Sequence, residues 1–204
     1  MTLFIDCLRL SRLKGETPNA KAGRYIVRYL SILANHLERD NLITIRRIQN
    51  GEVDLFKQMR LTSLQNAPYA FPSTYDAALR RSDESWQEQA ERTALGTDRA
   101  TFIAFSDDVP IGIAALYRLE DKVDSGELLQ VWVSPEYRGI GVARDLMDAI
   151  IKWAGENTFR RIIAGVTKVN ARALKFYIKY GFSIIDESSP NDSGGIHLVK
   201  EVNP

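Results

Sequence analysis

The fold of this chain is decided by residues 131–144, which read VWVSPEYRGIGVAR. The stretch starts with three apolar residues typical of a strand, and a proline then ends that strand. Gly139 and Gly141 follow and open an amphipathic helix; glycine lets a backbone approach a ligand without side-chain collision. The first amides of a helix have no partner within it and lie at the positive end of its dipole. The stretch therefore predicts a phosphate or pyrophosphate site, with Arg138 or Arg144 as charge partners.

Two other kinds of glycine loop fit these residues less well. A dinucleotide-binding fingerprint needs a third glycine or alanine where Arg144 stands, and its glycines follow the strand directly. A P-loop needs Gly-Lys-Ser/Thr, which is absent here. Two glycines can also be turn residues that bind nothing. A second motif is needed to choose among these interpretations.

That second motif is the segment 170–182, which reads NARALKFYIKYGF. Asn170 is a candidate N-cap and Gly181 a candidate C-terminal glycine, so the segment predicts a helix with both ends marked. Asn170 and Tyr177 are two turns apart, so both lie on one face, with roughly 10 Å of rise between them. The face offers an amide near its start and a phenol further along. Taken alone, Tyr177 is more typical of a packed core aromatic.

In this order, the two motifs resemble those of the GNAT superfamily of acyl-CoA-dependent N-acetyltransferases. Arg138-Gly139-Ile140-Gly141, with Ala143, is similar to the family's Arg/Gln-x-x-Gly-x-Gly/Ala pyrophosphate loop. Residues 170–182 are similar to its Asn-x-x-Ala-x-x-x-Tyr-x-x-x-Gly-Phe helix. The resemblance covers the chain from about Leu42 to its end. It implies an α/β fold with a mixed and mostly antiparallel central sheet flanked by helices.

The resemblance also implies roles for individual residues. Tyr177 corresponds to a tyrosine that often protonates the departing thiolate, and Glu127 to a glutamate that is the general base in some members. Other members place a glutamate five residues before the asparagine, where this chain has Gly165. Glu127, acting through water, is then the favoured base. The implied cofactor-binding residues, with Tyr177 beside them, are Val131, Trp132, Val133, Arg138, Gly139, Ile140, Gly141, Val142, Ala143, Arg144 and Asn170.

The rest of the chain alternates between strand and helix patterns. Residues 42–204 form the predicted N-acetyltransferase domain, and residues 1–41 an N-terminal extension with helical spacing over 24–37. That basic, amphipathic segment would suit a membrane surface or a partner, or simply pack on its own domain. Strand patterns cover residues 42–48, 101–105, 111–117, 127–133, 161–166, 182–185 and 196–199.

Composition argues against several classes of protein. With 45% apolar and 26% charged residues among 204, the chain is that of an ordinary globular protein. Its formal charge of +1 is unlike the basic footprint of a nucleic-acid binder. One cysteine and two histidines argue against a disulfide framework or a metal centre. No apolar run approaches the roughly 18 residues of a membrane span. We therefore expect a cytoplasmic protein, without a signal peptide, that binds no metal, nucleic acid or membrane.

The expected activity, implied by the resemblance, is transfer of an acetyl group from acetyl-CoA to a primary amine by direct attack on the thioester. The enzyme would be a monomer or homodimer. The alternative is a non-catalytic acyl-CoA-binding module, which Gly165 favours. The acceptor stays open among a protein N-terminus, a lysine, a polyamine, an amino acid and a drug. Its expected walls are residues 66–75 and 186–195, whose acidic side chains would suit a cationic amine or be solvated.

Overall fold

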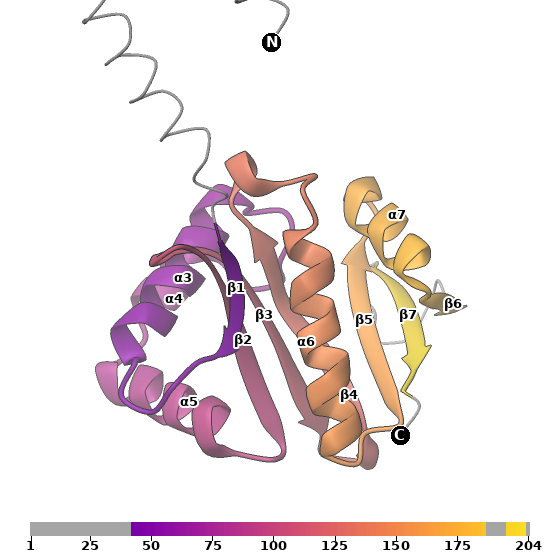
Figure 1. Cartoon of the computed structure of the whole chain (residues 1–204), viewed down its shortest axis with the longest axis horizontal. Helices are drawn as coiled ribbons and strands as arrows, with labels where there is room; N and C mark the ends of the chain where they lie inside the picture. Colours follow the sequence, from indigo (N-terminus) through magenta and orange to yellow (C-terminus); the bar gives the residue numbers. More distant parts are fainter. Residues whose placement is uncertain (1–41, 187–194, 203–204) are drawn as a thin grey trace, which may run out of the picture. The chain divides into compact units, whose positions relative to one another are not determined.

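A computed structural model describes residues 42–186 and 195–202 of the chain. This part contains a seven-stranded sheet in the order β1-β2-β3-β4-β5-β7-β6 (Figure 1). Neighbouring strands are antiparallel except β4 and β5, which are parallel. The mixed, mostly antiparallel sheet is therefore confirmed. Its strands are β1 (Ile43–Arg47), β2 (Arg99–Ser106), β3 (Val109–Leu119), β4 (Lys122–Val133), β5 (Arg161–Thr167), β6 (Ser183–Asp186) and β7 (Gly195–Glu201).

Helices pack on both faces of the sheet. Successive side chains of a strand point to opposite faces, and in this sheet the side chains on both faces are apolar. In β2, Phe102 and Ala104 belong to one buried cluster, and Ile103 and Phe105 to another on the opposite face. Figure 1 shows α6 lying across the first of these faces. The helices are α3 (Val53–Asn66), α4 (Tyr75–Leu79), α5 (Asp83–Leu95), η1 (Pro135–Tyr137, a 3-10 turn), α6 (Val142–Glu156) and α7 (Ala171–Tyr180).

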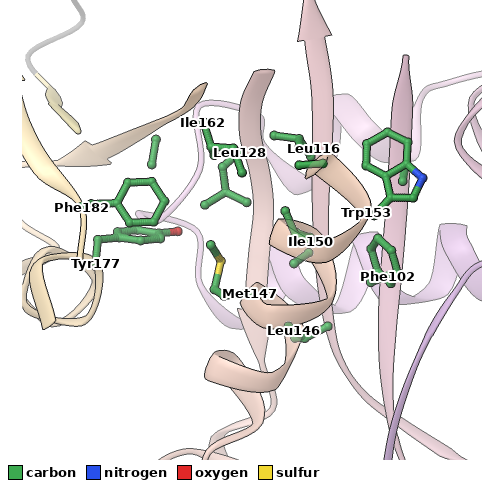
Figure 2. Close-up of a cluster of buried hydrophobic side chains, with 14 of the residues drawn as sticks. Phe102, Leu116, Leu128, Leu146, Met147, Ile150, Trp153, Ile162, Tyr177 and Phe182 are labelled. Atoms are coloured by element: carbon green, nitrogen blue, oxygen red, sulfur yellow. The ribbon is translucent and has the colours of Figure 1, made fainter. Parts of the chain in front are cut away.

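The first cluster joins α6 and α7 to the sheet. Leu146, Ile150 and Trp153 of α6 repeat at helical spacing and are buried in it (Figure 2). Each such side chain contributes about 2 kcal/mol through burial. The second cluster joins α3 and α5 to the opposite face, through Phe56 and Trp86 among others. We name these two sides the α6/α7 face and the α3/α5 face.

The parallel strands β4 and β5 separate partway along their length. Their pairing runs from Ser125 opposite Arg161 to Leu128 opposite Ala164 and goes no further. Both strands nevertheless continue, β4 to Val133 and β5 to Thr167. Beyond Leu128, the edge of β4 that faces β5 therefore has backbone groups with no strand partner. Such groups are available to a ligand.

A β-bulge in β4 sits where the strands begin to separate. Ala115 of β3 is opposite Leu129, whereas Ile113 is opposite Trp132, so β4 holds one extra residue. Gln130 lies within it and has a φ of 60°. The extra residue reverses the alternation of side chains. Val131 consequently packs on the α6/α7 face and Trp132 on the α3/α5 face.

The helix ends agree with the sequence. The side chains of Ser82 and Asn170 cap α5 and α7, and Gly181 ends α7 with a φ of 99°. Helix α4 was not expected; Thr74 caps it by accepting a hydrogen bond from the Ala77 amide. The predicted helix over 24–37 and the extension 1–41 lie outside the described residues. In the described part, no helix is both long enough and apolar enough to cross a membrane.

Candidate active site

A cavity of about 1090 Å³ lies beside the separated ends of β4 and β5. Its walls come from segments that are far apart in the sequence. They are the loop after α3, the end of β4, the turn before α6, the first turn of α6, and α7. The lining residues used below are Tyr69, Phe71, Val131, Trp132, Val133, Arg138, Gly139, Gly141, Ala143, Arg144, Asn170, Arg172, Tyr177 and Tyr180.

Gly139 and Gly141 of the glycine loop line the cavity. Gly139 and Gly141 have φ values of 89° and 108°, which L side chains rarely adopt. Gly141 is the N-cap of α6, and no side chain caps this helix end. Within the described residues, the amides from Gly139 to Ala143 donate no hydrogen bond to a backbone carbonyl. This helix start is therefore open to an anion.

The Arg144 amide differs from its neighbours. It donates to the Gly141 carbonyl at 2.8 Å and so already has a partner. Ile140 is exposed and Val142 is buried in the core, and neither side chain lines the cavity. Ile140 and Val142 can thus contribute only backbone amides to a ligand there.

Two guanidinium groups make the cavity positive. Arg138 donates from Nε to the Val133 carbonyl at 2.8 Å, which anchors it at the end of β4. Burial lowers the pKa of Arg138, and the positive charge of Arg172 lowers it further. Both arginines line the cavity. Two cations that repel one another are stabilised by an anion between them, as a pyrophosphate would be.

Tyr177 lies on the α6/α7 face, between α7 and the sheet. Figure 2 shows its ring among Leu128, Met147 and Phe182, and its ring centroid is 5.3 Å from that of Phe182. Burial raises the pKa of Tyr177 well above the ordinary value of 10. A phenol with the ordinary pKa of 10 is already protonated at neutral pH, so Tyr177 carries its proton there and presents a donor to the cavity that it lines.

A second phenol, Tyr180, lines the same cavity but has a partner. Its hydroxyl donates to Asp148 at 2.5 Å. Burial raises its pKa, and the hydrogen bond to Asp148 adds to this effect. The ring of Tyr180 also faces Lys200, whose Nζ is 5.4 Å from its centroid. Tyr180 is therefore held in place by its neighbours, whereas the Tyr177 hydroxyl has no hydrogen-bond partner among the described residues.

The predicted base is not at this cavity. Glu127 is exposed, does not line the cavity and lies opposite Tyr117 in the β3–β4 register. Its neighbour Leu128 points into the α6/α7 face, so Glu127 points to the α3/α5 face. Gly165 of β5 is also exposed, and a Cβ there would meet nothing within 4 Å. The structure therefore brings Tyr177, Asn170 and the glycine loop together and leaves Glu127 on the other side of the sheet.

Residues 66–75, the loop after α3, were expected to be one wall of the acceptor site. In the structure, residues 66–71 line the cavity, and the Tyr69 carbonyl accepts a hydrogen bond from the Thr167 hydroxyl at 3.2 Å. This contact joins residues 98 positions apart, so no local pattern announces it. Of the other expected wall, residues 187–194 lie outside the described residues. In the described part, no group of three or more His, Cys, Asp and Glu residues could hold a metal.

The sequence profile of the Acetyltransferase (GNAT) family matches residues 61–182, more than half of the chain. An uncharacterised N-acetyltransferase of Mycobacterium tuberculosis (strain H37Rv) is 36% identical over 86 residues, which are 42% of this chain and 54% of that protein. An N-acetyltransferase 9-like protein of Caenorhabditis briggsae is 30% identical over 119 residues, 52% of this chain and 57% of its own length. The chain thus spans about half the length of the curated relatives it matches. It belongs to the acetyltransferase (GNAT) family.

Solved structures share the fold. The PaiA N-acetyltransferase of Thermoplasma acidophilum, in complex with coenzyme A, has a TM-score of 0.65 at 20% identity and covers 78% of this chain and 99% of its own. The putative acetyltransferase yncA of Salmonella typhimurium, with its cofactor acetyl-CoA, has a TM-score of 0.63 at 16% identity. It covers 80% of this chain and 95% of its own. At these identities, the likeness establishes the α/β acetyltransferase fold.

Proposed function

We propose that this chain transfers the acetyl group of acetyl-CoA to a primary amine by direct attack of the amine on the thioester. One observation carries the proposal: a single cavity holds the open start of α6, the separated end of β4 and the protonated phenol of Tyr177. Two proteins of the same fold have been solved with coenzyme A or acetyl-CoA, which supports acetyl-CoA as the donor.

The chain's residues suit such a donor from one end to the other. The amides around Gly141, with Arg138 and Arg172, offer positive charge for a pyrophosphate. The backbone of Val131 to Val133 has no strand partner on the side toward β5. Apart from the Val133 carbonyl, which accepts from Arg138 Nε, it offers hydrogen bonds to the amides of a pantetheine arm. Asn170 caps α7 with its side-chain oxygen, so its amide nitrogen remains available to the same arm.

The reaction then needs proton transfers at nitrogen and at sulfur. An amine with a pKa of roughly 10 is mostly protonated at neutral pH, so a base must first take its ammonium proton, and we assign this step to Glu127 acting through water. The nitrogen lone pair then attacks the thioester carbonyl carbon, and negative charge develops on its oxygen, where a free β4 amide stabilises it. The carbon–sulfur bond breaks, and the Tyr177 hydroxyl gives its proton to the departing thiolate. The second proton of the nitrogen passes to solvent, and solvent returns a proton to Tyr177.

The proposed acid and the proposed base lie on opposite faces of the sheet. Tyr177 lies on the α6/α7 face and Glu127 on the α3/α5 face. Between them, β4 and β5 have separated. We place the acceptor on the α3/α5 face, so that the attacking nitrogen and the leaving sulfur are on opposite sides of the sheet.

A non-catalytic acyl-CoA-binding module is the second candidate, because Glu127 does not line the cavity and Gly165 has no carboxylate. The test is release of free coenzyme A thiol from acetyl-CoA with amines of each class: peptides, polyamines, amino acids and aminoglycosides. Calorimetry measures acetyl-CoA binding in parallel. We expect binding with amine-dependent thiol release. Binding without release by any amine would establish the binding module instead.

A further inference from the structure

Arg60 is a buried cation without an acidic partner in the described part of the chain. It lies on α3 and is 8% exposed, and its guanidinium donates a hydrogen bond to the Ser63 hydroxyl at 3.3 Å. Burial lowers its pKa to about 10. A guanidinium has five N–H donors, so most of its hydrogen-bonding capacity is unused. A buried charge in this state is costly unless something else completes its shell.

Arg81 is a second cation without an acidic partner among the described residues, but it is only partly buried. It lies just before α5 and donates to the hydroxyl and carbonyl of Ser85, with its guanidinium carbon 4.0 Å from the ring centroid of Trp86. No carboxylate of the described residues forms an ion pair with Arg60 or Arg81. The charge of Arg81 is close enough to lower the pKa of Arg60. Two cations are therefore close together without a counter-ion.

Other arginines of the same domain show what a completed shell looks like. Arg46 forms two hydrogen bonds of 2.8 Å to the carboxylate of Glu52. Arg47 donates to the backbone carbonyls of Thr93, Gly96 and Arg99. In contrast, Arg60 has one long bond to a hydroxyl. The difference indicates that the partner of Arg60 comes from outside the described part of the chain.

The two cations lie on the side of the sheet proposed for the acceptor; neither lines the cavity itself, and Arg60 is joined to it through Phe71. The guanidinium carbon of Arg60 is 4.6 Å from the ring centroid of Phe71, and Phe71 lines the cavity. Both arginines are close enough to the Tyr117 phenol for it to influence their pKa values. Tyr117 is opposite Glu127 in the β3–β4 register, so both point to the α3/α5 face. The cations, the cavity loop and the proposed base are therefore on one side of the sheet.

We propose that Arg60 and Arg81 bind a carboxylate of the acceptor, so that the acceptor is a small molecule with both an amine and a carboxylate, as in an amino acid. This rests on the proposed acetyl transfer. A carboxylate matches the planar donors of a guanidinium in two parallel hydrogen bonds. Its binding would neutralise the repulsion between the two arginines and hold the amine at a fixed distance from them. A polyamine, which carries only positive charge, would be repelled.

The test compares each of the twenty L-amino acids with its carboxamide as acceptor, by release of free coenzyme A thiol. The carboxamide has the less basic amine, so more of it is unprotonated at pH 7.5, and amine reactivity alone would favour it. We expect at least one amino acid to have a kcat/KM at least about tenfold above its carboxamide, as hydrogen bonds between charged groups give. Equal kcat/KM for each amino acid and its carboxamide, or turnover only of amines without a carboxylate, would contradict the inference. Either result would still agree with the proposed acetyl transfer. No thiol release with any amine overturns both.

Variants then assign the preference to Arg60. Arg60→Met should raise KM for the amino acid at least about tenfold and leave the carboxamide nearly unchanged. Arg60→Lys keeps the charge and should recover part of the preference. Arg80→Met removes an exposed arginine one position before Arg81 and should behave as wild type. Thermal unfolding checks that each variant is folded. A purely structural role for Arg60 would lower turnover of both acceptors equally, which would contradict the proposal.

Discussion

At the scale of single residues, the chemistry of Tyr177 follows from its burial. Its raised pKa leaves the phenol protonated across the neutral range, and the same burial packs its ring against Phe182. The hydroxyl and the ring can be separated experimentally, because phenylalanine keeps the ring. This makes Tyr177 the sharpest test of the proposed mechanism.

Tyr177→Phe should lower kcat by roughly 100-fold or more, since a general acid contributes about 100- to 10,000-fold. Thiols are good leaving groups, so we expect the lower end. Acetyl-CoA affinity and thermal stability should change little. Steady-state kinetics and calorimetry measure these quantities.

Tyr180→Phe is the matched control, three residues along the same helix. Its hydroxyl is engaged with Asp148, so kcat should stay within a few-fold of wild type. Loss in Tyr180→Phe with normal kcat in Tyr177→Phe would identify Tyr180 as the acid. Normal kcat in both variants would mean that water protonates the thiolate.

The glycine loop offers a second residue-scale prediction. Gly141→Asp should weaken acetyl-CoA binding sharply, because it places bulk and negative charge at the open start of α6. The position has a φ of 108°, so the variant also pays a backbone strain of about 1–2 kcal/mol. Calorimetry with acetyl-CoA measures the effect on affinity.

Gly51→Asp separates the two effects. Gly51 has a similar φ of 88°, and a Cβ there would meet nothing within 4 Å. It does not line the cavity. This variant should lose similar stability with unchanged acetyl-CoA affinity. If Gly141→Asp also bound acetyl-CoA normally, the pyrophosphate interpretation of the loop would be wrong.

The ion pair between Arg46 and Glu52 predicts a pH dependence of stability. The hydrogen bond from Arg46 lowers the pKa of Glu52 below its ordinary value of 4.5. A lowered pKa in the folded state means that the contribution is complete above pH 4.5 and declines as the pH falls through the folded value. Glu52→Gln should cost about 0.5–1 kcal/mol at pH 7, as partly exposed pairs do. Urea unfolding should show this difference shrinking below pH 4.5; a constant difference would contradict the assignment.

At the scale of elements, two helix caps have the same geometry and different surroundings. The Ser85 amide donates to the Ser82 hydroxyl at 3.2 Å, and the Ala173 amide donates to the Asn170 side chain at 3.1 Å. Asn170 lines the cavity and Ser82 does not. Comparing variants at the two caps therefore distinguishes an effect on helix stability from an effect on ligand binding.

Ser82→Ala and Asn170→Ala should each cost about 1 kcal/mol of stability, because each leaves one helix amide without its partner. Only Asn170→Ala should also weaken acetyl-CoA binding. Urea unfolding and calorimetry on both variants provide the measurements. Equal acetyl-CoA affinity in the two variants would reduce Asn170 to a structural cap.

Strand β4 shows how one element serves both faces. Without the extra residue at Gln130, the strict alternation of a strand would place Val131 and Leu128 on opposite faces. With it, both pack on the α6/α7 face, and Trp132 fills the α3/α5 face. The bulge also coincides with the point where β4 leaves β5. One inserted residue thus opens the strand edge and sets which side chains surround the opening.

At the scale of the whole molecule, the described fold begins with β1 at Ile43. A chain that starts at Asn41 should be cooperatively folded and bind acetyl-CoA with unchanged affinity, because the cavity is lined by residues from Asn66 onward. Thermal unfolding and calorimetry against the full-length protein provide the comparison. Recovery of this chain only as aggregate would mean that residues before 42 complete the core.

The sequence by itself determined the local features of this protein. The caps at Ser82 and Asn170, the glycines before α6 and after α7, and the apolar spacing of α6 are each encoded within a few residues, because helix ends and turns depend on neighbouring backbone geometry. These signals also carried the resemblance to the acetyltransferase family, since its motifs lie at such helix ends. The existence of most strands followed in the same way from period-two patterns.

Only the tertiary structure decided how those pieces face one another. The bulge at Gln130 depends on the pairing of β4 with β3, and the place of β7 between β5 and β6 depends on contacts distant in sequence. These contacts put Tyr177 and Glu127 on opposite faces, bring Tyr69 to Thr167, and leave Arg60 and Arg81 close together with no ion pair to an acid of the described residues. Burial and missing partners are properties of neighbours in space, and a sequence records only neighbours along the chain.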